Sequence, residues 1–499
     1  NDHVIDVNDN DINNSNGNVD DEMNNNQIKS VTNNNNNIES NVNDNIVIED
    51  NGNIENNNNY NYTTKSGRKI NIPSRYRNNK KIINAFNSNV SKLSKERCDK
   101  AETNELKALA IDKDTFKYMT LKDIQKANGK VLPTSTVFTE KLDENGNWIK
   151  DKGRVVVLGN LQIAVDPNDT YSSTASTTSL KIILSIGASK GLKPIVMDIG
   201  NAFVNAPMTD QDIYIRLNSN SSKNLCEIDE RAKQYVDKYN GCVYAKLKKW
   251  LYGLRESPVH WFEEISKVLI SSGYKKSNYD NCVFIRMGGN GYSIILLHVD
   301  DILLLADSDN EHNRMVDILV NAFTNVSVKR GKKFMFLGNE IEFLDNGNIA
   351  FSNKSKLQQI LNDNHITNIS TIPCVSNIHT RNDNSPKLEK QEREWYHSTI
   401  MRIMFIATRS RAFDLLMIVS VLATRVKDCR EEDRQHLMKL LKYINYTIDY
   451  NMTFKRDSKI ILEAYSDASF NCYQEDGKGQ SAFAIFVTND GAAVMVKSN

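Results

Sequence analysis

Short apolar runs alternate with longer stretches of helical spacing along most of the chain. Branched apolar runs predict β-strands at residues 155–158, 195–199, 292–298 and 302–306. Apolar residues three and four positions apart predict helices at residues 180–188, 259–270, 313–323, 354–361, 401–426 and 434–444. Strand patterns return near the end, at residues 459–465 and 482–487. The fold class that this order predicts is α+β, with a helical module and a further small sheet after about residue 350.

The first hundred residues differ in composition from the rest. Residues 1–60 hold 24 Asn and 12 acidic residues against one basic residue, Lys29, so this segment carries −11. Because the whole chain carries +1, the remaining 439 residues carry +12, of which residues 61–100 hold +9. We therefore predict a disordered Asn-rich acidic segment at 1–62 and a basic linker at 63–100. The linker either tethers a polyanion or is simply solvated.

Composition also excludes several classes of protein. The longest apolar run, residues 415–423, is too short to cross a bilayer, so we expect no membrane partner. Seven cysteines occur without a CxxC pair, which argues against a disulfide framework or a zinc knuckle and favours a reducing compartment. The chain begins with Asn rather than Met, and we expect it to be a fragment or a processed product.

Three aspartates are the strongest candidates for chemistry. Asp300 and Asp301 separate two apolar strand patterns, as at the tip of a tight hairpin, and Asp198 lies within the strand predicted at 195–199. Neighbouring carboxylates repel each other unless a proton, a basic partner or a divalent cation neutralises them. Two-metal phosphoryl transfer uses such hard oxygen ligands on rigid elements. From the spacing alone, an ordinary Asp-Asp hairpin turn remains the alternative.

A series of short motifs runs in order from about residue 63 to the end. They are KSGRK at 65–69, PSRY at 73–76, MDIGNAF at 197–203, LKKWLYGLRESP at 247–258 with Trp261, VDDIL at 299–303, FLGNEI at 336–341 and YSDAS at 465–469. Together they resemble the reverse transcriptase region of copia-type (Pseudoviridae) long-terminal-repeat retrotransposon polyproteins. The last motif resembles the opening strand of the ribonuclease H domain in that family.

This resemblance implies a right-hand polymerase fold. Residues 101–350 would form the fingers and palm, residues 351–458 a helical thumb or connection, and residues 459–499 a truncated ribonuclease H-like start. Asp467 is the one carboxylate of a ribonuclease H site that we identify, so we expect no activity from that segment.

The resemblance also implies an activity and its partners. The chain would be an RNA-directed and DNA-directed DNA polymerase that extends an RNA or DNA template-primer with deoxynucleoside triphosphates (dNTPs). Two Mg²⁺ ions held by Asp198, Asp300 and Asp301 would serve the reaction. The expected locations are a cytoplasmic virus-like particle and the nucleus, and the sequence leaves self-association open.

Four further residues are candidates for substrate binding through the resemblance. Phe203 would pack under the sugar of the incoming nucleotide and exclude a 2′-hydroxyl, although plain core packing is the alternative. Lys152 and Arg154 would hold the triphosphate, or else are two cations of a surface strand with their stems buried. Glu256 stands where the family usually has Gln, and we expect its charge to repel the phosphates.

Departures from the family pattern keep other hypotheses open. Leu158 stands where Lys or Arg is usual, and His298 stands where Tyr or Phe usually precedes the VDD motif. By strand alternation we expect His298 to share a face with Asp300. Leu158 and Glu256 favour a decayed or repurposed copy that binds nucleic acid without polymerising. A palm-fold nucleotide cyclase is a further alternative, but the chain lacks the glycine-rich acid loop of that class.

Overall fold

The computed structural model describes most of the chain beyond residue 92. The described residues are 62–63, 69–70, 93–142, 148–162, 170–209, 211–288, 291–375, 378–456, 458–471, 477–488 and 492–498. The chain divides into two compact units, Asn1–Lys80 and Lys81–Asn499. In the first unit, the described residues are the antiparallel pair β1 (Tyr62–Thr63) and β2 (Lys69–Ile70). The predictions for residues 1–61 therefore fall outside the described residues.

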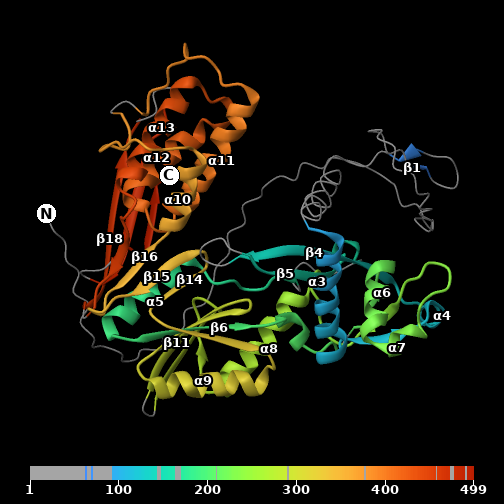
Figure 1. Cartoon of the computed structure of the whole chain (residues 1–499). Coiled ribbons are helices and arrows are strands. Elements are labelled where there is room, and N and C mark those ends of the chain that lie inside the picture. Colours follow the sequence, from blue (N-terminus) through green and yellow to red (C-terminus); the bar gives the residue numbers. More distant parts are fainter. Residues whose placement is uncertain are drawn as a thin grey trace, which may run out of the picture. The chain divides into compact units, whose positions relative to one another are not determined.

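A five-stranded sheet and the helices around it form the first part of the second unit. Its order is β3 (Phe116–Met119), β8 (Tyr244–Leu247), β7 (Tyr214–Arg216), β4 (Val131–Leu142) and β5 (Trp148–Val157), with β4 and β7 parallel and the other pairs antiparallel. Its helical segments are α3 (Lys95–Lys107), η1 (Ala108–Asp112), α4 (Leu121–Lys126), η2 (Gly159–Leu161), α6 (Ser219–Ile228) and α7 (Glu230–Lys233). Figure 1 shows α3 lying across β4 and β5.

Helix α3 begins inside the segment that we expected to be linker. The Ser94 side chain accepts a hydrogen bond from the Arg97 N–H and so caps the first turn. Cys98, Ala101 and Leu106 are buried on one side of this helix. Its low apolar content hides this amphipathic face, so charge alone placed the boundary about five residues too late.

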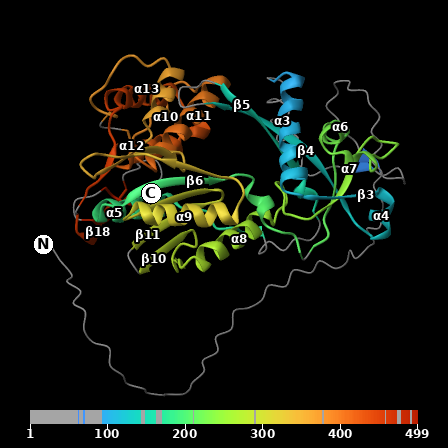
Figure 2. The same ribbon diagram turned by 60° about the horizontal axis from the view of Figure 1, so that its bottom comes forward.

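The second sheet has six strands and carries the candidate aspartates. Its order is β13 (Val326–Arg330), β6 (Lys193–Ile199), β12 (Asp301–Ala306), β11 (Gly291–His298), β10 (Val283–Gly288) and β9 (Lys275–Lys276), all antiparallel. The packing helices are α5 (Thr177–Lys190), α8 (Ser257–Ser271) and α9 (Asp309–Ala322), with η4 (Ala202–Asn205) after β6. Figures 1 and 2 show α8 and α9 along the same side of this sheet.

Both faces of this sheet are buried, which explains its continuously apolar strands. Leu296, Leu303 and Leu305 pack into one core cluster with residues of α5, such as Leu184. The alternate residues Leu297, Ile302 and Leu304 pack into a second cluster with residues of α8 and α9, such as Trp261 and Leu319. The strands predicted at 195–199, 292–298 and 302–306 are therefore confirmed.

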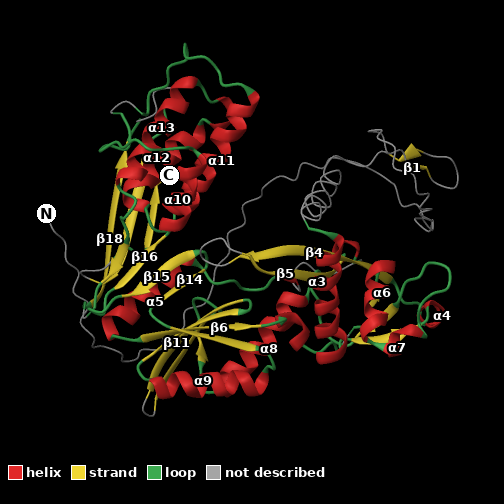
Figure 3. Ribbon diagram, viewed as in Figure 1, coloured by secondary structure: helices red, strands yellow, loops and turns green. Residues whose placement is uncertain are grey.

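A four-stranded sheet and a group of helices follow. The sheet order is β14 (Lys333–Phe336), β15 (Asn339–Phe343), β16 (Ile349–Ser352) and β17 (Met452–Phe454). The helices are α10 (Lys354–Asp363), α11 (Lys390–Ala407), α12 (Ala412–Thr424), η5 (Val426–Asp428) and α13 (Glu431–Tyr446), seen together at the top of Figure 3.

The single helix predicted at 401–426 is wrong. The helix stops at Ala407 and resumes at Ala412. In the break, the Ser410 hydroxyl donates to Asn353 Oδ1 at 2.8 Å, and the Arg411 guanidinium donates to the Thr447 hydroxyl at 2.6 Å. These distant partners fix the turn, and the apolar pattern on either side does not contain them.

The last described sheet has the order β18 (Ile460–Ser469), β19 (Gln480–Thr488) and β20 (Met495–Ser498). Strands at the predicted 459–465 and 482–487 are thus present. Asp467 lies opposite Ala482 and is exposed. Among the described residues, no helix is long and apolar enough to cross a membrane.

A buried acid ties α9 to the six-stranded sheet. Glu311 accepts hydrogen bonds from Arg314 Nη2 at 2.7 Å, Arg286 Nη1 at 2.9 Å and Ser293 Oγ at 2.9 Å. Burial opposes its ionisation, but the bonds and charges of these partners lower the pKa of Glu311 from 4.5 to about 2. This carboxylate therefore contributes stability above about pH 4.5 that is lost as the pH falls through its folded pKa.

We expect Glu311→Gln to lower the free energy of unfolding by about 3 kcal/mol at neutral pH, because two arginines lose their buried partner. The difference from wild type should shrink as the pH falls from about 4.5 towards 2. Urea unfolding across this range measures it. The exposed Glu263→Gln should change stability by less than about 0.5 kcal/mol. Equal losses in both variants would contradict the assignment.

Candidate active site

The turn between β11 and β12 brings the aspartates to one end of the six-stranded sheet. His298 and Asp301 are opposite each other, so Val299 and Asp300 form a two-residue turn. Val299 has φ of +57°, a left-handed conformation that is strained for a β-branched residue. The Trp261 indole N–H donates to the Val299 carbonyl at 2.7 Å, and the Ile199 N–H donates to the Asp300 carbonyl at 3.0 Å. The core and the neighbouring strand therefore hold the strained turn.

The strand register places the side chains on a common face. Asp301 on β12 is directly opposite Asp198 on β6, and directly opposite His298 on β11. Opposite residues of an antiparallel pair point to the same side, with Cβ atoms roughly 5 Å apart. His298 thus shares its face of the sheet with Asp301. We expected it to share a face with Asp300, but Asp300 lies in the turn, where strand alternation no longer applies.

Repulsion among these acids changes their proton affinities. Burial, with Asp300 and Asp198 nearby, raises the pKa of Asp301 to about 6. Burial and Asp300 also raise the pKa of Asp198, while Lys152 and Lys141 act in the opposite direction. Burial lowers the pKa of His298, and its Nδ1 has no hydrogen-bond partner among the described residues. The cluster is therefore short of positive charge.

The donor set fits Mg²⁺ better than it fits a caged metal. Within the described ranges, no group of three or more His, Cys, Asp or Glu side chains is arranged to enclose a metal ion. Mg²⁺ in proteins typically takes one or two carboxylates and completes its octahedron with water and substrate phosphates. Asp198, Asp300 and Asp301 offer such hard oxygen donors on rigid elements.

Two cations on β5 lie in the field of these acids. Lys152 and Arg154 alternate with the buried Gly153, so their side chains share the other face of the strand. Burial and Arg154 lower the pKa of Lys152, whereas Glu105, Asp198 and Asp300 raise it. The five-stranded and six-stranded sheets thus bring opposite charges together.

Phe203 faces an aromatic partner that sequence reasoning missed. Its ring meets the Tyr252 ring edge to face, with centroids 4.9 Å apart. Phe203 also lines a cavity of about 300 Å³ with Trp261 and Val299. Burial, together with Glu105 and Asp300, raises the pKa of Tyr252, which keeps its hydroxyl protonated. The motif at 247–258 contains Tyr252, but the motif alone does not indicate that Tyr252 contacts Phe203.

The end of β5 is clamped to the loop that carries Tyr252. The Val157 N–H donates to the Tyr252 carbonyl at 2.8 Å. Gly253 has φ of +95°, and a Cβ there would overlap the Val157 carbonyl oxygen. The next residue, Leu158, donates its N–H to the Pro133 carbonyl at 2.9 Å. At position 158, where the family usually has Lys or Arg, this chain has an apolar side chain. Its backbone is held by the hydrogen bond to Pro133.

Glu256 is placed differently from our expectation. Its side chain is 5% exposed and accepts hydrogen bonds from Gln211 Nε2 at 2.6 Å and Gln162 Nε2 at 3.0 Å. The Gln162 amide oxygen in turn accepts the Arg255 N–H at 2.9 Å. The carboxylate is committed to two neutral amides at the start of α8. The repulsion of phosphates by Glu256 stays a prediction, and the carboxylate already accepts two amide hydrogen bonds.

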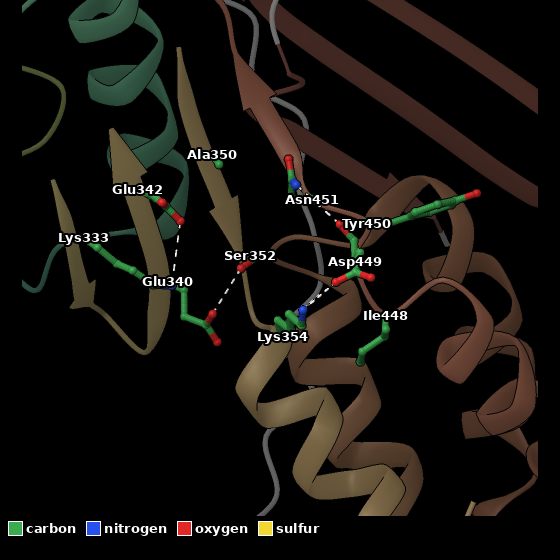
Figure 4. A pocket seen from close by; sticks show the side chains of 10 residues that line it. All are labelled: Lys333, Glu340, Glu342, Ala350, Ser352, Lys354, Ile448, Asp449, Tyr450 and Asn451. Carbon is green, nitrogen blue, oxygen red and sulfur yellow. Dashed lines mark hydrogen bonds and ion pairs between the residues drawn. The ribbon is translucent and has the colours of Figure 1, made fainter. Parts of the chain in front are cut away.

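Another cleft, of about 230 Å³, lies beside β14, β15 and β16 (Figure 4). Its charges are paired within the wall: Lys354 Nζ lies 2.5 Å from Asp449 Oδ1, and Lys333 Nζ lies 3.8 Å from Glu342 Oε2. The Ser352 hydroxyl donates to Glu340 at 3.4 Å. The charged side chains of this cleft thus neutralise one another, whereas the aspartates of the β11–β12 turn repel one another.

Three aspartates at one end of an antiparallel sheet, with Lys152 nearby, are an arrangement typical of two-metal phosphoryl transfer. The profile of the family described as "Reverse transcriptase (RNA-dependent DNA polymerase)" matches residues 116–376, just over half of the chain. The chain belongs to this family. The resemblance to copia-type retrotransposon reverse transcriptases is confirmed.

Two retrotransposon polyproteins are similar to this chain in sequence. The retrovirus-related Pol polyprotein from transposon RE1 of Arabidopsis thaliana is 26% identical over 360 residues, which are 70% of this chain and 23% of the relative. The Pol polyprotein from transposon TNT 1-94 of Nicotiana tabacum is 24% identical over 410 residues, 80% of this chain and 29% of the relative. The chain thus spans about a quarter of the length of these relatives.

One solved structure with a similar chain is that of the foamy viral protease-reverse transcriptase dRH in complex with double-stranded DNA. It is 14% identical, with a TM-score of 0.39, and the match covers 76% of this chain and 54% of that chain.

We expect Asp301→Asn to be more stable than wild type in a chelator, by about 1 kcal/mol, because it removes one of three repelling charges at a half-buried site. Mg²⁺ at about 10 mM should raise the melting temperature of wild type by a few degrees and that of the variant by less. Thermal unfolding followed by circular dichroism, with and without Mg²⁺, tests this. Asp317→Asn, on the exposed side of α9, is the matched control. A Mg²⁺ shift of equal size in Asp301→Asn and wild type would refute a cation site here.

Proposed function

We propose that the chain is an RNA-directed DNA polymerase that adds deoxynucleotides to the 3′-end of a primer. The observation that carries this proposal is the register that sets Asp198 opposite Asp301, beside Asp300 and within the field of Lys152. In this proposal the six-stranded sheet is the palm, the five-stranded sheet belongs to the fingers, and α10 to α13 supply the thumb.

The three aspartates would hold two Mg²⁺ ions. With both ions bound, the site has the positive charge needed to favour an ionised primer hydroxyl and a leaving pyrophosphate. Lys152 and Arg154 attract the triphosphate and hold it in line with the primer end. The fixed turn at Val299 keeps Asp300 and Asp301 from moving as charge shifts during the reaction.

Phe203 and Tyr252 give the nucleotide an apolar support. Their edge-to-face contact makes a rigid corner beside the Val299 turn. A sugar packed on this corner would leave little room for a 2′-hydroxyl, which favours deoxynucleotides. Template and primer, RNA or DNA, would be attracted by the net +12 of the chain beyond residue 60.

A nucleic-acid-binding protein without polymerase activity is the second candidate. Leu158 favours it, because an apolar side chain stands where a cation would help to hold phosphates. Glu256 favours it less than the sequence suggests, because its carboxylate already accepts hydrogen bonds from Gln162 and Gln211. Lys152 and Arg154 still offer two cations within the same strand.

The test is extension of a labelled DNA primer on an RNA template in Mg²⁺. We expect wild type to extend the primer, and Asp300→Asn to lose about 1,000-fold in rate, as expected for removing several kcal/mol of charge stabilisation. Asp317→Asn should behave as wild type. Glu256→Gln should change the KM for dNTP by less than about threefold, because the carboxylate faces amides rather than phosphates.

Two outcomes would count against this proposal. Template-primer binding without any extension by wild type would favour the second candidate. Extension that is equal in wild type and Asp300→Asn would mean that the site is elsewhere.

A further inference from the structure

Helix α3 packs against strand β5, and successive contacts between them advance in matched steps. Arg97, Ala101 and Glu105 are four residues apart and therefore share one face of the helix. Arg97 donates to Asp151 at 2.6 and 2.8 Å, and the Ala101 carbonyl oxygen would lie 3.0 Å from a Cβ on Gly153. Four helical residues and two strand residues both advance by roughly 6 Å. The next step therefore brings the Glu105 carboxylate near the backbone N–H of Val155, which acts to lower its pKa.

Gly153 makes this approach possible and also separates the two cations. Because the helix backbone occupies the space of a side chain at position 153, Lys152 and Arg154 must both point to the other face of β5. The N–H groups of alternate residues point to the free edge of this strand, as the Val157 N–H does toward Tyr252. The Glu105 carboxylate reaches that edge at Val155, the residue after Arg154.

Glu105 is buried without sufficient partners. It is 7% exposed, and its Oε1 has no hydrogen-bond partner among the described residues. Glu102, one turn earlier, is 2% exposed but accepts hydrogen bonds from Ser221 Oγ at 2.6 Å and Asn224 Nδ2 at 2.7 Å. A buried carboxylate oxygen left unpaired costs stability, so its retention calls for an explanation outside packing.

We propose that Glu105 is a positioning residue for Lys152 and Arg154, acting on them from behind the strand to set how they receive a nucleoside triphosphate. This inference rests on the proposed function. When no nucleotide is bound, the Glu105 carboxylate attracts Lys152 and Arg154 and limits their mutual repulsion. When a triphosphate binds, the cations turn their charge to the phosphates, and Glu105 takes a proton from solvent because the added negative charge disfavours its ionised form.

The charged surroundings agree with this exchange. The charged or titratable groups that act on Glu105 are Lys152 and Arg154 of β5, across the strand, and Tyr252 of the loop before α8. Burial raises the pKa of Glu105 to about 7, although the two cations act to lower it. A bound triphosphate raises this pKa further. The bound complex therefore holds more protons than the free enzyme, and dNTP affinity falls as the pH rises.

The experiment measures dNTP affinity without chemistry. A complex of the full chain with a dideoxy-terminated primer and template is titrated with the next complementary dNTP in Mg²⁺, at pH 6.5 and 8.5. For wild type we expect Kd to rise about tenfold over this range, the effect of about one unit of pKa coupling. Glu105→Gln should vary less than about threefold and should bind at pH 8.5 as tightly as wild type does at pH 6.5.

Glu102→Gln is the matched control on the same helix. It should melt at a lower temperature than wild type but retain the wild-type pH dependence of dNTP affinity. If Glu105→Gln keeps the wild-type pH dependence, or if wild type binds no dNTP, the inference is overturned. Failure of the proposed function is recognised separately, by the lack of extension from an unblocked primer.

Discussion

The register of strands β6, β12 and β11 is the constraint on which the site depends. The acids cannot bring themselves together, because they repel, so apolar residues must align the strands. Ile302 and Leu304 face one core cluster while Leu303 and Leu305 face the other. A slip by one residue would exchange these two sets and turn Asp301 away from Asp198. The burial of both sheet faces therefore fixes the position of the carboxylates.

Two hydrogen bonds join the charged site to the hydrophobic core and to the neighbouring loop. Trp261, which is almost fully buried in the core, reaches the Val299 carbonyl and so ties the strained turn to the hydrophobic cluster. The Val157 N–H ties the end of β5 to the Tyr252 loop in the same way. Because each anchor is a hydrogen bond between neutral groups, it holds geometry without adding charge near the acids. Lys152 then supplies positive charge near the carboxylates, with Arg154 beside it on the same strand.

The sequence predicted the parts of this arrangement that follow from local pattern. The apolar strands, the hairpin and the three aspartates were visible because alternation and turn chemistry operate over a few residues. The environment of Glu256 was not, since its partners Gln162 and Gln211 lie 94 and 45 residues away in the sequence. The break at 408–411 likewise depends on Asn353 and Thr447. A family pattern identified position 256 as important, but only its contacts reveal whether the charge faces substrate or protein.

Three places where the described part of the chain gives up stability lie at the proposed site. Val299 holds a left-handed backbone that costs about 1–3 kcal/mol, although its neighbours pack well. Asp301 and Asp198 are held face to face, and Glu105 is buried with an unpaired oxygen. Packing requires none of these three features: a glycine would relieve the turn, and an amide would relieve either pair of buried acid oxygens. By contrast, the buried acids Glu102, Glu256 and Glu311 are all supplied with donors. Unrelieved strain and charge that gather around one turn and one pair of cations are the features expected of a site organised to bind a highly charged substrate.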